Sequence, residues 1–216
     1  GDQNDRNGCA NSCQLNRCQA IFFEPPSRLL SGDGPRVVRI VDVNQDGNQD
    51  VLSINFAENG VAVHYGNGNG TFRNDWRNYP VGDEPRAVET ADLNADGRLD
   101  LLVANNGSDN ISVLFGQPDG SFQAGPDIGA GGEEPRSINA ADLNGDGHTD
   151  LILALHIDDA VAIHLGEGEG RYAAAVTYAA SERPVWSEVA DLNGDGHPDV
   201  VVANETGDVL TVHLGA

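Results

Sequence analysis

The 216-residue sequence predicts an all-β fold made of four repeated units, and three observations support this prediction. An acidic nonapeptide starts at Asp42, Asp92, Asp142 and Asp191, so its spacing is 50, 50 and 49 residues. A proline-containing tripeptide (34–36, 84–86, 134–136 and 183–185) and a tetrapeptide ending in glycine (63–66, 113–116, 163–166 and 212–215) keep the same spacing. No segment has helical periodicity. A period of about 50 residues with four short strands per unit is typical of a β-propeller with one blade per repeat.

Each unit contains four predicted strands in the same order. The first strand follows the proline, as in 86–91, and leads into the acidic nonapeptide. The second is a continuous apolar run, so we expect neighbouring sheets to cover both of its faces. These runs are 51–54, 101–104, 151–154 and 200–203. The third strand ends at the recurring glycine, and a glycine-rich turn and a looser fourth segment complete the unit.

The repeat sets the expected domain boundaries. Residues 1–20 form an N-terminal extension and residues 21–216 form the propeller, with units 35–84, 85–134, 135–183 and 184–216 plus 21–34. The last unit ends after its third strand, and residues 21–36 resemble 121–136 in their place before a unit. We therefore expect four blades of four antiparallel strands, closed by pairing of the N-terminal strand with the last blade. The alternatives are a part of a larger ring and a half-ring that dimerises into eight blades.

The repeated nonapeptide, D-x-N-x-D-G-x-x-D, is typical of a metal-binding loop. Positions 1, 3, 5 and 9 supply side-chain oxygens, position 7 supplies a backbone carbonyl, and the glycine at position 6 permits a sharp turn. Hard oxygen ligands of this kind suit Ca²⁺ better than Mg²⁺. Without a cation, carboxylates about 4 Å apart would repel one another by roughly 1 to 4 kcal/mol. Turn-forming propensity alone would explain one such loop, but not four with the same ligand order.

We therefore expect about four Ca²⁺ ions, one per repeat. The predicted ligands are Asp42, Asn44, Asp46, Asn48 and Asp50; Asp92, Asn94, Asp96, Arg98 and Asp100; Asp142, Asn144, Asp146, His148 and Asp150; and Asp191, Asn193, Asp195, His197 and Asp199. The side chain at position 7 varies because only its carbonyl is expected to bind.

The repeat resembles the FG-GAP/VCBS family, whose calcium-binding blades also occur in integrin α-subunit propellers. The segment "PRAVETADLNADGRLDLLVANNGSDNISVLFGQPDGSF" carries the resemblance, which extends over residues 21–216. It implies a β-propeller with calcium between the first two strands of each blade, a secreted or cell-surface location, and a role in adhesion or ligand binding. Integrin propellers have seven blades, whereas this sequence has four units.

Composition excludes several classes of partner. The formal net charge is −22, from 34 acidic and 12 basic residues, so we expect neither nucleic acid nor an anionic membrane surface to bind. The longest apolar run is about six residues, too short to insert into a bilayer. Extracellular calcium modules bind with dissociation constants of about 10⁻⁴ to 10⁻³ M. We therefore expect a secreted, periplasmic or cell-surface protein.

Three cysteines, Cys9, Cys13 and Cys18, precede the first blade. They allow at most one internal disulfide, and the remaining thiol can stay free, bind a ligand or form an inter-chain disulfide. The alternatives are a small disulfide-pinned cap and a covalent link to a second chain.

Three further groups of residues are candidate sites. His64, His164 and His213 recur in the third strand, where the second unit has leucine, so we interpret them as packing residues. Recurring arginines at 36, 86 and 136 either pair with nearby carboxylates or line a channel mouth for an anion. Trp76 and Trp186 depart from the repeat and are the aromatic residues to examine for ligand contact.

No nucleophile, base and acid recur together, so no catalytic residue is predicted. The expected function is a calcium-binding, non-enzymatic module for protein binding, adhesion or scaffolding, possibly within a larger assembly. The alternatives are a carbohydrate-binding lectin and, less favoured, a calcium-dependent polysaccharide-active enzyme. Its partner is a protein or a glycan.

Overall fold

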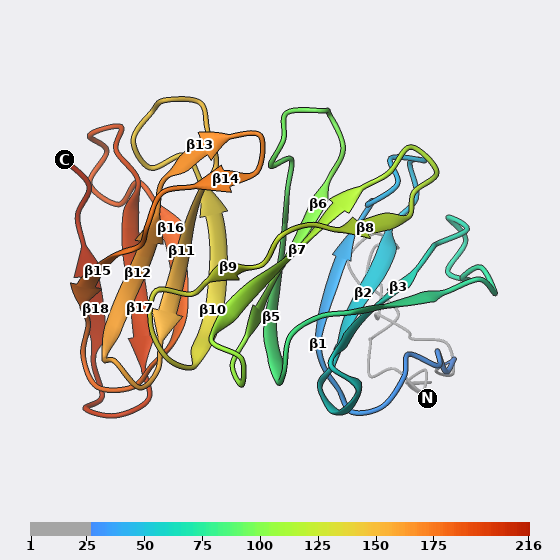
Figure 1. Cartoon of the computed structure of the whole chain (residues 1–216), viewed down its shortest axis with the longest axis horizontal. Coiled ribbons are helices and arrows are strands. Elements are labelled where there is room, and N and C mark those ends of the chain that lie inside the picture. The colour runs from blue at the N-terminus through green and yellow to red at the C-terminus, as the bar shows by residue number, and fades with distance from the viewer. Residues whose placement is uncertain (1–26) are drawn as a thin grey trace, which may run out of the picture. The chain divides into compact units, whose positions relative to one another are not determined.

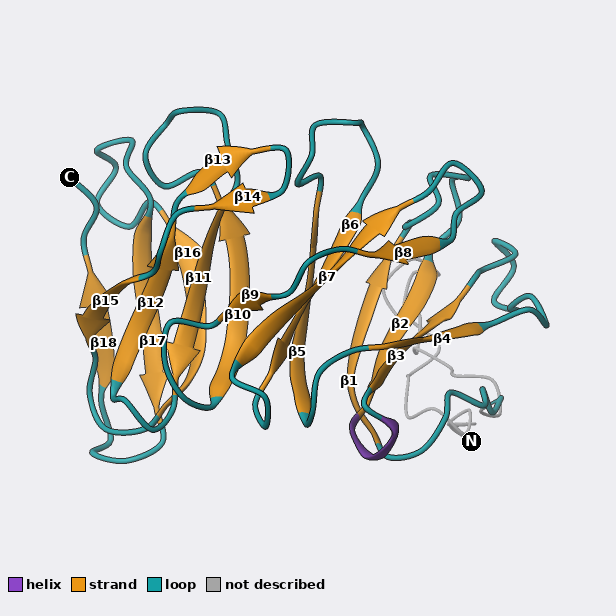
Figure 2. Ribbon diagram, viewed as in Figure 1, coloured by secondary structure: helices purple, strands orange, loops and turns teal. Residues whose placement is uncertain are grey.

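Short strands and tight turns make up almost all of the part of the chain that the structure, a computed structural model, describes: residues 27–216 (Figure 2). Ser31–Ala216 form one compact unit. The other unit is Gly1–Leu30, of which Ser27–Leu30 are exposed and have no regular secondary structure. The predicted extension, residues 1–20 with the three cysteines, lies outside the described residues.

Four antiparallel sheets follow one another in sequence order and form the blades of a β-propeller (Figure 1), as predicted. Blade 1 contains β1 (Pro35–Val41), β2 (Asp50–Asn55), β3 (Gly60–His64) and β4 (Arg77–Pro80), with a 3-10 turn at Phe56–Glu58. Blade 2 contains β5 (Pro85–Ala91), β6 (Asp100–Asn105) and β7 (Asn110–Gly116), and both β8 (Phe122–Ala124) and β9 (Ile128–Gly129) pair with β7. Blade 3 contains β10 (Pro135–Ala141), β11 (Asp150–Leu155), β12 (Ala160–His164) and β15 (Val176–Ala179), beside the hairpin of β13 (Gly166–Gly168) and β14 (Arg171–Tyr172). Blade 4 contains β16 (Pro184–Ala190), β17 (Asp199–Asn204) and β18 (Leu210–His213).

Every first strand begins with the recurring proline and has the same irregularity. The register with the second strand shifts after Pro35, Pro85, Pro135 and Pro184. Proline has no N–H to give to a β-ladder, so it is found at the start of strands or at bulges. The landmark that fixes the repeat in the sequence therefore fixes the start of each innermost strand.

The hydrophobic core lies between the blades. One cluster joins blades 1 and 2, with Leu52 and Leu101 at its centre, and a second joins blades 2 and 3 around Leu102 and Leu153. A smaller cluster joins blades 3 and 4. In blades 2 and 3 the second strands are buried over their whole length, which confirms that both of their faces are covered. Innermost strands pack in sequence, β1 on β5, β5 on β10 and β10 on β16.

A side-chain cap joins each of the first three blades to the next one. Asn59, Asp109 and Asp159 lie between the second and third strands and have φ near +50°. The side-chain oxygen of Asn59 accepts the amide of Glu84 at 3.0 Å, and the Asp109 carboxylate accepts the amide of Glu134 at 2.8 Å. The Asp159 carboxylate accepts the amide of Arg183 at 2.8 Å. Asn and Asp tolerate the left-handed conformation better than other non-glycine residues.

The described residues do not test the predicted closure of the ring by an N-terminal strand. Among residues 27–216, β17 is the only strand that pairs with β18, and residues 27–34 form no strand. Instead, the Ser31 carbonyl accepts the Asn55 side chain, and the Gly34 carbonyl accepts the amide of Phe56 at 3.0 Å. Both donors lie at the end of β2 or directly after it, so these hydrogen bonds hold residues 31–34 against blade 1. The rest of the predicted N-terminal strand, residues 21–26, lies outside the described residues.

The core between blades 2 and 3 allows a direct test of packing. Leu153 is fully buried in this cluster, so Leu153→Ala should lower the free energy of unfolding by about 2 to 5 kcal/mol. Denaturant unfolding at a fixed calcium concentration measures the change. The matched control is Ile157→Ala, because Ile157 is half exposed in the following turn and should lose less than about 1 kcal/mol. Equal effects of the two substitutions would contradict this assignment of the core.

Candidate metal-binding loops

The four acidic loops, residues 42–50, 92–100, 142–150 and 191–199, connect the first and second strands of their blades. All four lie at the upper edge of the molecule in Figure 1, opposite the turns that join the second and third strands. The first two loops also touch, because the side chain of Gln45 donates to the Gly97 carbonyl at 2.7 Å. The repeat therefore places four equivalent sets of oxygen atoms on one edge.

Within each loop, the side chains at positions 1, 3 and 5 fold around the backbone of the turn. In the first loop, Asp42 accepts the amides of Asp46 and Gly47 at 3.1 and 2.8 Å. Asn44 accepts the same Asp46 amide at 3.0 Å, and Asp46 accepts the amide of Asn48 at 2.8 Å. In the third and fourth loops, the asparagine oxygen at position 3 also accepts the amide of position 5, and the carboxylate at position 5 accepts the amide of position 7. These distances lie within 0.1 Å of those in the first loop. Oxygens from positions 1 and 3 that share one amide must lie close together.

Two residues with positive φ produce this geometry. Position 6 is always glycine, with φ of 84° to 89°, and position 4 has φ of 57° to 76°. Glycine occupies position 4 in the third and fourth loops, whereas Gln45 and Ala95 adopt the strained conformation in the first two. Position 4 was not singled out from the sequence, because its residue type is not constant.

The aspartate at position 9 has a different environment from the others. Asp50, Asp100, Asp150 and Asp199 are fully buried. In the second loop, the two oxygens of Asp100 accept the amides of Leu93 at 2.9 Å and Gly116 at 2.8 Å. The other three loops have the same pair of bonds, from position 2 and from the recurring glycine that follows the third strand. This carboxylate therefore ties the loop to the end of the third strand.

The recurring glycine, which ends the third strand in blade 2 and lies two residues after it in the other blades, is required by this contact. A Cβ atom at Gly66 would lie 2.1 Å from the carbonyl oxygen of Gln49, and one at Gly116 would lie 2.4 Å from that of Leu99. Gly166 and Gly215 have the same close approach, at 2.4 and 2.5 Å. The recurring glycine was a landmark in the sequence, and its role is to let this backbone approach the acidic loop.

Hydrogen bonding and burial shift the pKa values of these carboxyls in opposite directions. The amide of the residue at position 7 lowers the pKa of Asp46, Asp146 and Asp195, so these carboxylates stay ionised. Burial raises the pKa of Asp50 and Asp100, and the amide bonds to their oxygens oppose that shift. In the first loop, the ionised form is therefore favoured at position 5 and disfavoured at position 9.

The donor set suits a hard cation, with fewer free carboxylates than the sequence suggests. No three histidine, cysteine or acidic side chains within residues 27–216 lie close enough together to hold a metal ion. In the second loop, both oxygens of the ninth-position carboxylate already accept backbone amides. Each oxygen keeps a further lone pair, and positions 1 and 5 supply two carboxyl groups beside an asparagine oxygen. A set of this kind matches the ligand preference of Ca²⁺.

The side chains at position 7 do not share a common role. In the second loop, Arg98 forms an ion pair with Asp96 and donates to the Gly116 carbonyl at 2.9 Å. His148 lies against Gly168. Neither contact involves the backbone carbonyl of position 7, whose role as a ligand stays a prediction.

The recurring histidines and the tryptophans occupy mainly structural positions. His64 is fully buried and stacks on Trp76, with 5.4 Å between ring centroids. His164 faces the carbonyls of Ala130 and Ala173, each at 3.3 Å. Trp186 is half exposed on blade 4, and its indole donates to Glu188 at 2.8 Å.

The recurring arginines gather near the starts of the innermost strands. Arg136 forms an ion pair with Glu134 at 3.0 Å, as expected. Arg36 and Arg86 instead flank the ring of Phe56, at 3.5 and 4.9 Å from its centroid. Burial and the other two arginines lower the pKa of Arg86. The carboxylates of Glu84 and Glu134 oppose this shift.

The structural role of the ninth-position carboxylate, as the acceptor of two buried amides, can be tested in the second loop. Asp100→Ala leaves two buried amides without an acceptor and should lower the free energy of unfolding by about 3 to 5 kcal/mol. Asp100→Asn keeps one acceptor and should cost about half as much. Denaturant unfolding in the presence of a chelator measures both. Asp96→Ala is the matched control, since Asp96 lies in the same loop but is solvent-accessible; a loss as large as that of Asp100→Ala would contradict the assignment.

Comparison with known proteins supports the same fold. Among similar solved structures, a Lactobacillus plantarum protein has a TM-score of 0.59 and 19% identity, with 87% of this chain and 55% of that chain covered. BBS1N in complex with ARL6DN has a TM-score of 0.56 and 13% identity, covering 82% and 55%. The Photorhabdus luminescens Tc holotoxin pore has a TM-score of 0.51 and 19% identity, covering 82% and 9%. This chain thus spans about half or less of the length of these proteins.

At these identities the solved structures show the fold alone. No curated protein matches the chain in sequence. The model of the FG-GAP-like repeat matches residues 42–103, 92–153 and 144–202, and each match contains an acidic loop and the strands that it joins. These matches together cover most of the four blades. The chain therefore belongs to the FG-GAP-like repeat family.

Proposed function

We propose that this chain is a calcium-stabilised, non-enzymatic propeller module that binds a protein partner outside the cytoplasm. The observation that carries the proposal is the fourfold repetition of one loop geometry, with carboxyl groups at positions 1 and 5 beside an asparagine oxygen. A single acidic turn can have many roles. Four copies on one edge all need a positive charge among their carboxylates. A divalent cation in each loop relieves the repulsion among its carboxylates.

The proposed ligands are those predicted from the sequence, with a division of roles between them. Positions 1, 3 and 5 and the carbonyl of position 7 would surround the ion. The buried aspartate at position 9 would hold the loop in place from below and contribute any remaining lone pair. Four Ca²⁺ ions would change the formal net charge of the chain from −22 to −14, since each adds two positive charges.

The location outside the cytoplasm follows from the expected strength of binding. Loops of this kind in extracellular modules need calcium near 10⁻⁴ to 10⁻³ M. No helix in the described part of the chain has the length and apolar character needed to span a membrane. The non-enzymatic role is proposed because the carboxyls with perturbed pKa values in residues 27–216 have structural partners. They either belong to the acidic loops or bond to nearby side chains, as Asp75 does with Arg73 and Glu134 with Arg136.

Calcium should raise the melting temperature. At tenfold to a hundredfold excess over the dissociation constant, each occupied loop contributes about 1.4 to 2.7 kcal/mol to stability. Scanning calorimetry with calcium and then with excess chelator measures the shift, which should be several degrees, and calcium titration should give about four sites. Asp127→Asn, outside the loops, should leave the shift unchanged. A melting temperature independent of calcium would overturn the proposal.

The second loop should bind calcium more weakly than the others. The Arg98 guanidinium already neutralises Asp96 there, so an incoming ion must displace it. Arg98→His, which gives the residue found in the third and fourth loops, should strengthen binding at this loop by about two- to fivefold. Terbium luminescence competed with calcium measures the affinity. Arg73→His is the control, because its ion pair with Asp75 lies outside the loops; an equal gain in that variant would contradict the explanation.

A further inference from the structure

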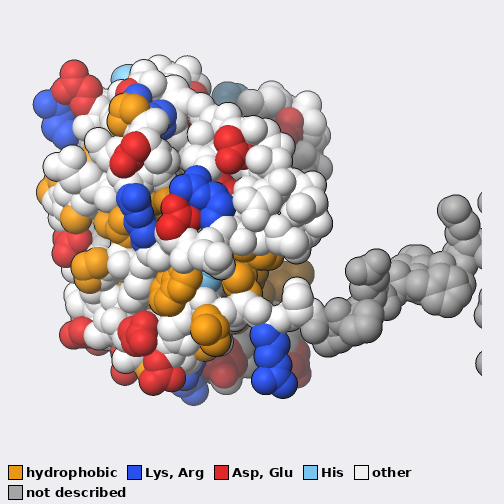
Figure 3. Space-filling model, turned by 90° about the vertical axis from the view of Figure 1, so that its right-hand side faces the viewer, with side chains coloured by type: hydrophobic (Ala, Val, Ile, Leu, Met, Phe, Trp, Pro, Cys, Tyr) orange, Lys and Arg blue, Asp and Glu red, His pale blue; other side chains and the backbone are white. Residues whose placement is uncertain are grey.

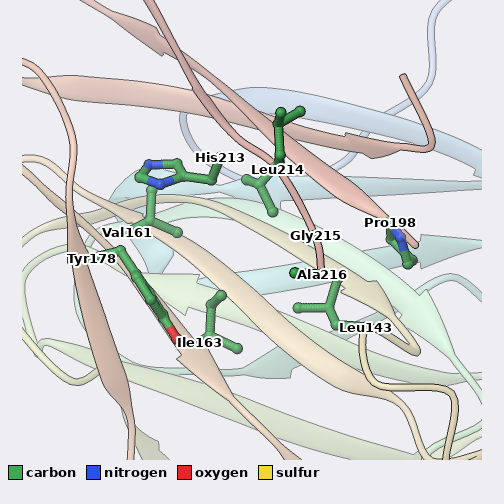
Figure 4. A pocket seen from close by; sticks show the side chains of 10 residues that line it. Leu143, Val161, Ile163, Tyr178, Pro198, His213, Leu214, Gly215 and Ala216 are labelled. Carbon is green, nitrogen blue, oxygen red and sulfur yellow. The ribbon is translucent and has the colours of Figure 1, made fainter. Parts of the chain in front are cut away.

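The junction between blades 3 and 4 has a small apolar core. Its buried side chains are Ile152 and Val161 of blade 3 and Val200 and Val202 of blade 4. A cavity of about 300 Å³ borders this core, and side chains of both blades line it (Figure 4). Apolar packing is therefore incomplete here, so polar contacts matter more to this junction than to the two larger ones.

Polar side chains join the two blades at two places. Within the first strands, the hydroxyl oxygens of Ser137 and Ser187 lie 2.8 Å apart, and the Asn139 side chain donates to the Ser187 carbonyl at 2.7 Å. At the lower edge of the molecule in Figure 1, Nε2 of His156 lies 3.0 Å from a carboxylate oxygen of Glu205. His156 directly follows β11 and Glu205 directly follows β17, so this contact links the ends of the two second strands.

His156 is almost completely removed from water, since it is only 1% exposed. A carboxylate accepts hydrogen bonds and does not donate them, so in the neutral ring Nε2 carries the proton that bonds to Glu205. Nδ1 is buried and has no hydrogen-bond partner among residues 27–216. A second proton would have to bind at Nδ1, where no group of the described chain accepts a hydrogen bond from it. Protonation of this ring is therefore costly in the folded junction.

Charged groups of both blades surround His156. Glu134 and Arg136 lie at the start of blade 3, and the Glu134 carbonyl accepts the His156 amide at 3.1 Å. Arg183 directly precedes β16, and its side chain lies 3.6 Å from that of Glu205. Burial and the two arginines lower the pKa of His156, and the two carboxylates oppose this shift. The Glu205 side chain is half exposed and also faces Arg183, so it compensates poorly for the burial of the ring.

We propose that protonation of His156 in mild acid releases blade 4 from blade 3. At neutral pH the uncharged ring donates to Glu205 and holds the lower edge of the junction. At lower pH a charge forms in a site that excludes water and adjoins two arginines, so the junction loses stability. Blade 4 then loses the core that it shares with blade 3. A single repeat cannot bury its apolar face alone, so release unfolds the blade.

Acid weakens this junction because the pKa of His156 in the folded chain lies below the ordinary value of 6.5. The unfolded blade binds a proton near pH 6.5, whereas the folded blade binds it only at lower pH. The contribution of His156 to stability is therefore complete above pH 6.5 and decreases as the pH falls toward the folded pKa. One proton is involved, so the ratio of folded to unfolded blade 4 changes by at most about tenfold per pH unit.

The experiment is urea unfolding of the full chain between about pH 5.5 and 7.5, where histidine titrates and ordinary carboxyls stay ionised. Calcium is kept in fixed excess. In a Trp76→Phe background, Trp186 of blade 4 is the only tryptophan, because the chain has two. Its indole donates to Glu188 at 2.8 Å within β16, so its fluorescence reports unfolding of blade 4. The ratio of folded to unfolded blade 4 should fall about three- to tenfold from the highest to the lowest pH.

Two substitutions at the contact should change this pH profile in opposite directions. His156→Gln keeps an N–H for Glu205 but cannot be protonated, so most of the decrease should disappear. The acidic loops are intact in this variant, so any effect of protons on calcium binding remains and is measured separately. Glu205→Gln removes a carboxylate that opposes the shift in pKa, so the decrease should become larger.

His64→Leu is the matched control, since blade 2 has leucine at the corresponding position. His64 is fully buried in blade 1, and burial lowers its pKa as well. Figure 3, which views the molecule from the blade 1 side, shows little histidine at the surface there. The control should leave the pH profile of Trp186 unchanged. No decrease in the unsubstituted contact, an equal decrease in His156→Gln, a smaller one in Glu205→Gln, or an equal loss of it in His64→Leu would overturn the proposal.

Discussion

The buried carboxylate at the ninth position of each loop is the interaction on which the rest of the blade depends. In one residue it joins the start of the second strand, the acidic loop before it and the glycine that ends the third strand. A buried charge is costly unless it is fully hydrogen-bonded, and here two amides meet that requirement. The glycine is constrained by the same contact, since a side chain at that position would collide with the loop backbone.

The hydrogen bonds of the ninth-position carboxylate also explain how the loop can be both rigid and charged. Because position 9 faces inward, the remaining carboxylates face solvent from a backbone that is already fixed. A cation arriving there meets a prepared site and need not organise a flexible turn. Calcium would then add stability to a blade whose strands are held together without it, which differs from small metal-dependent domains that fold only with their ion.

Much of this arrangement can be predicted from the sequence, because strands and loops recur with a fixed period. The second strands, the acidic loops and the prolines that begin each blade are all visible as residue types at constant spacing. The role of Asp100 cannot be predicted, because the sequence does not distinguish a carboxylate that accepts two backbone amides from one that binds a metal. The caps at Asn59, Asp109 and Asp159 were missed because Asn and Asp are common in turns of every kind. The closure of the ring stays a prediction, because residues 21–26 lie outside the described residues. Ser31 and Gly34 bond to the end of β2 and the turn after it.

The unequal size of the three cores has a consequence for how the unit comes apart. Cores between the first three blades contain many fully buried side chains, whereas the one between blades 3 and 4 is small and borders a cavity. Arrays in which each repeat contacts only its neighbours lose cooperativity when one junction is weak. Blade 4 should therefore detach first and populate a partly unfolded intermediate, with the fastest amide hydrogen exchange of any blade.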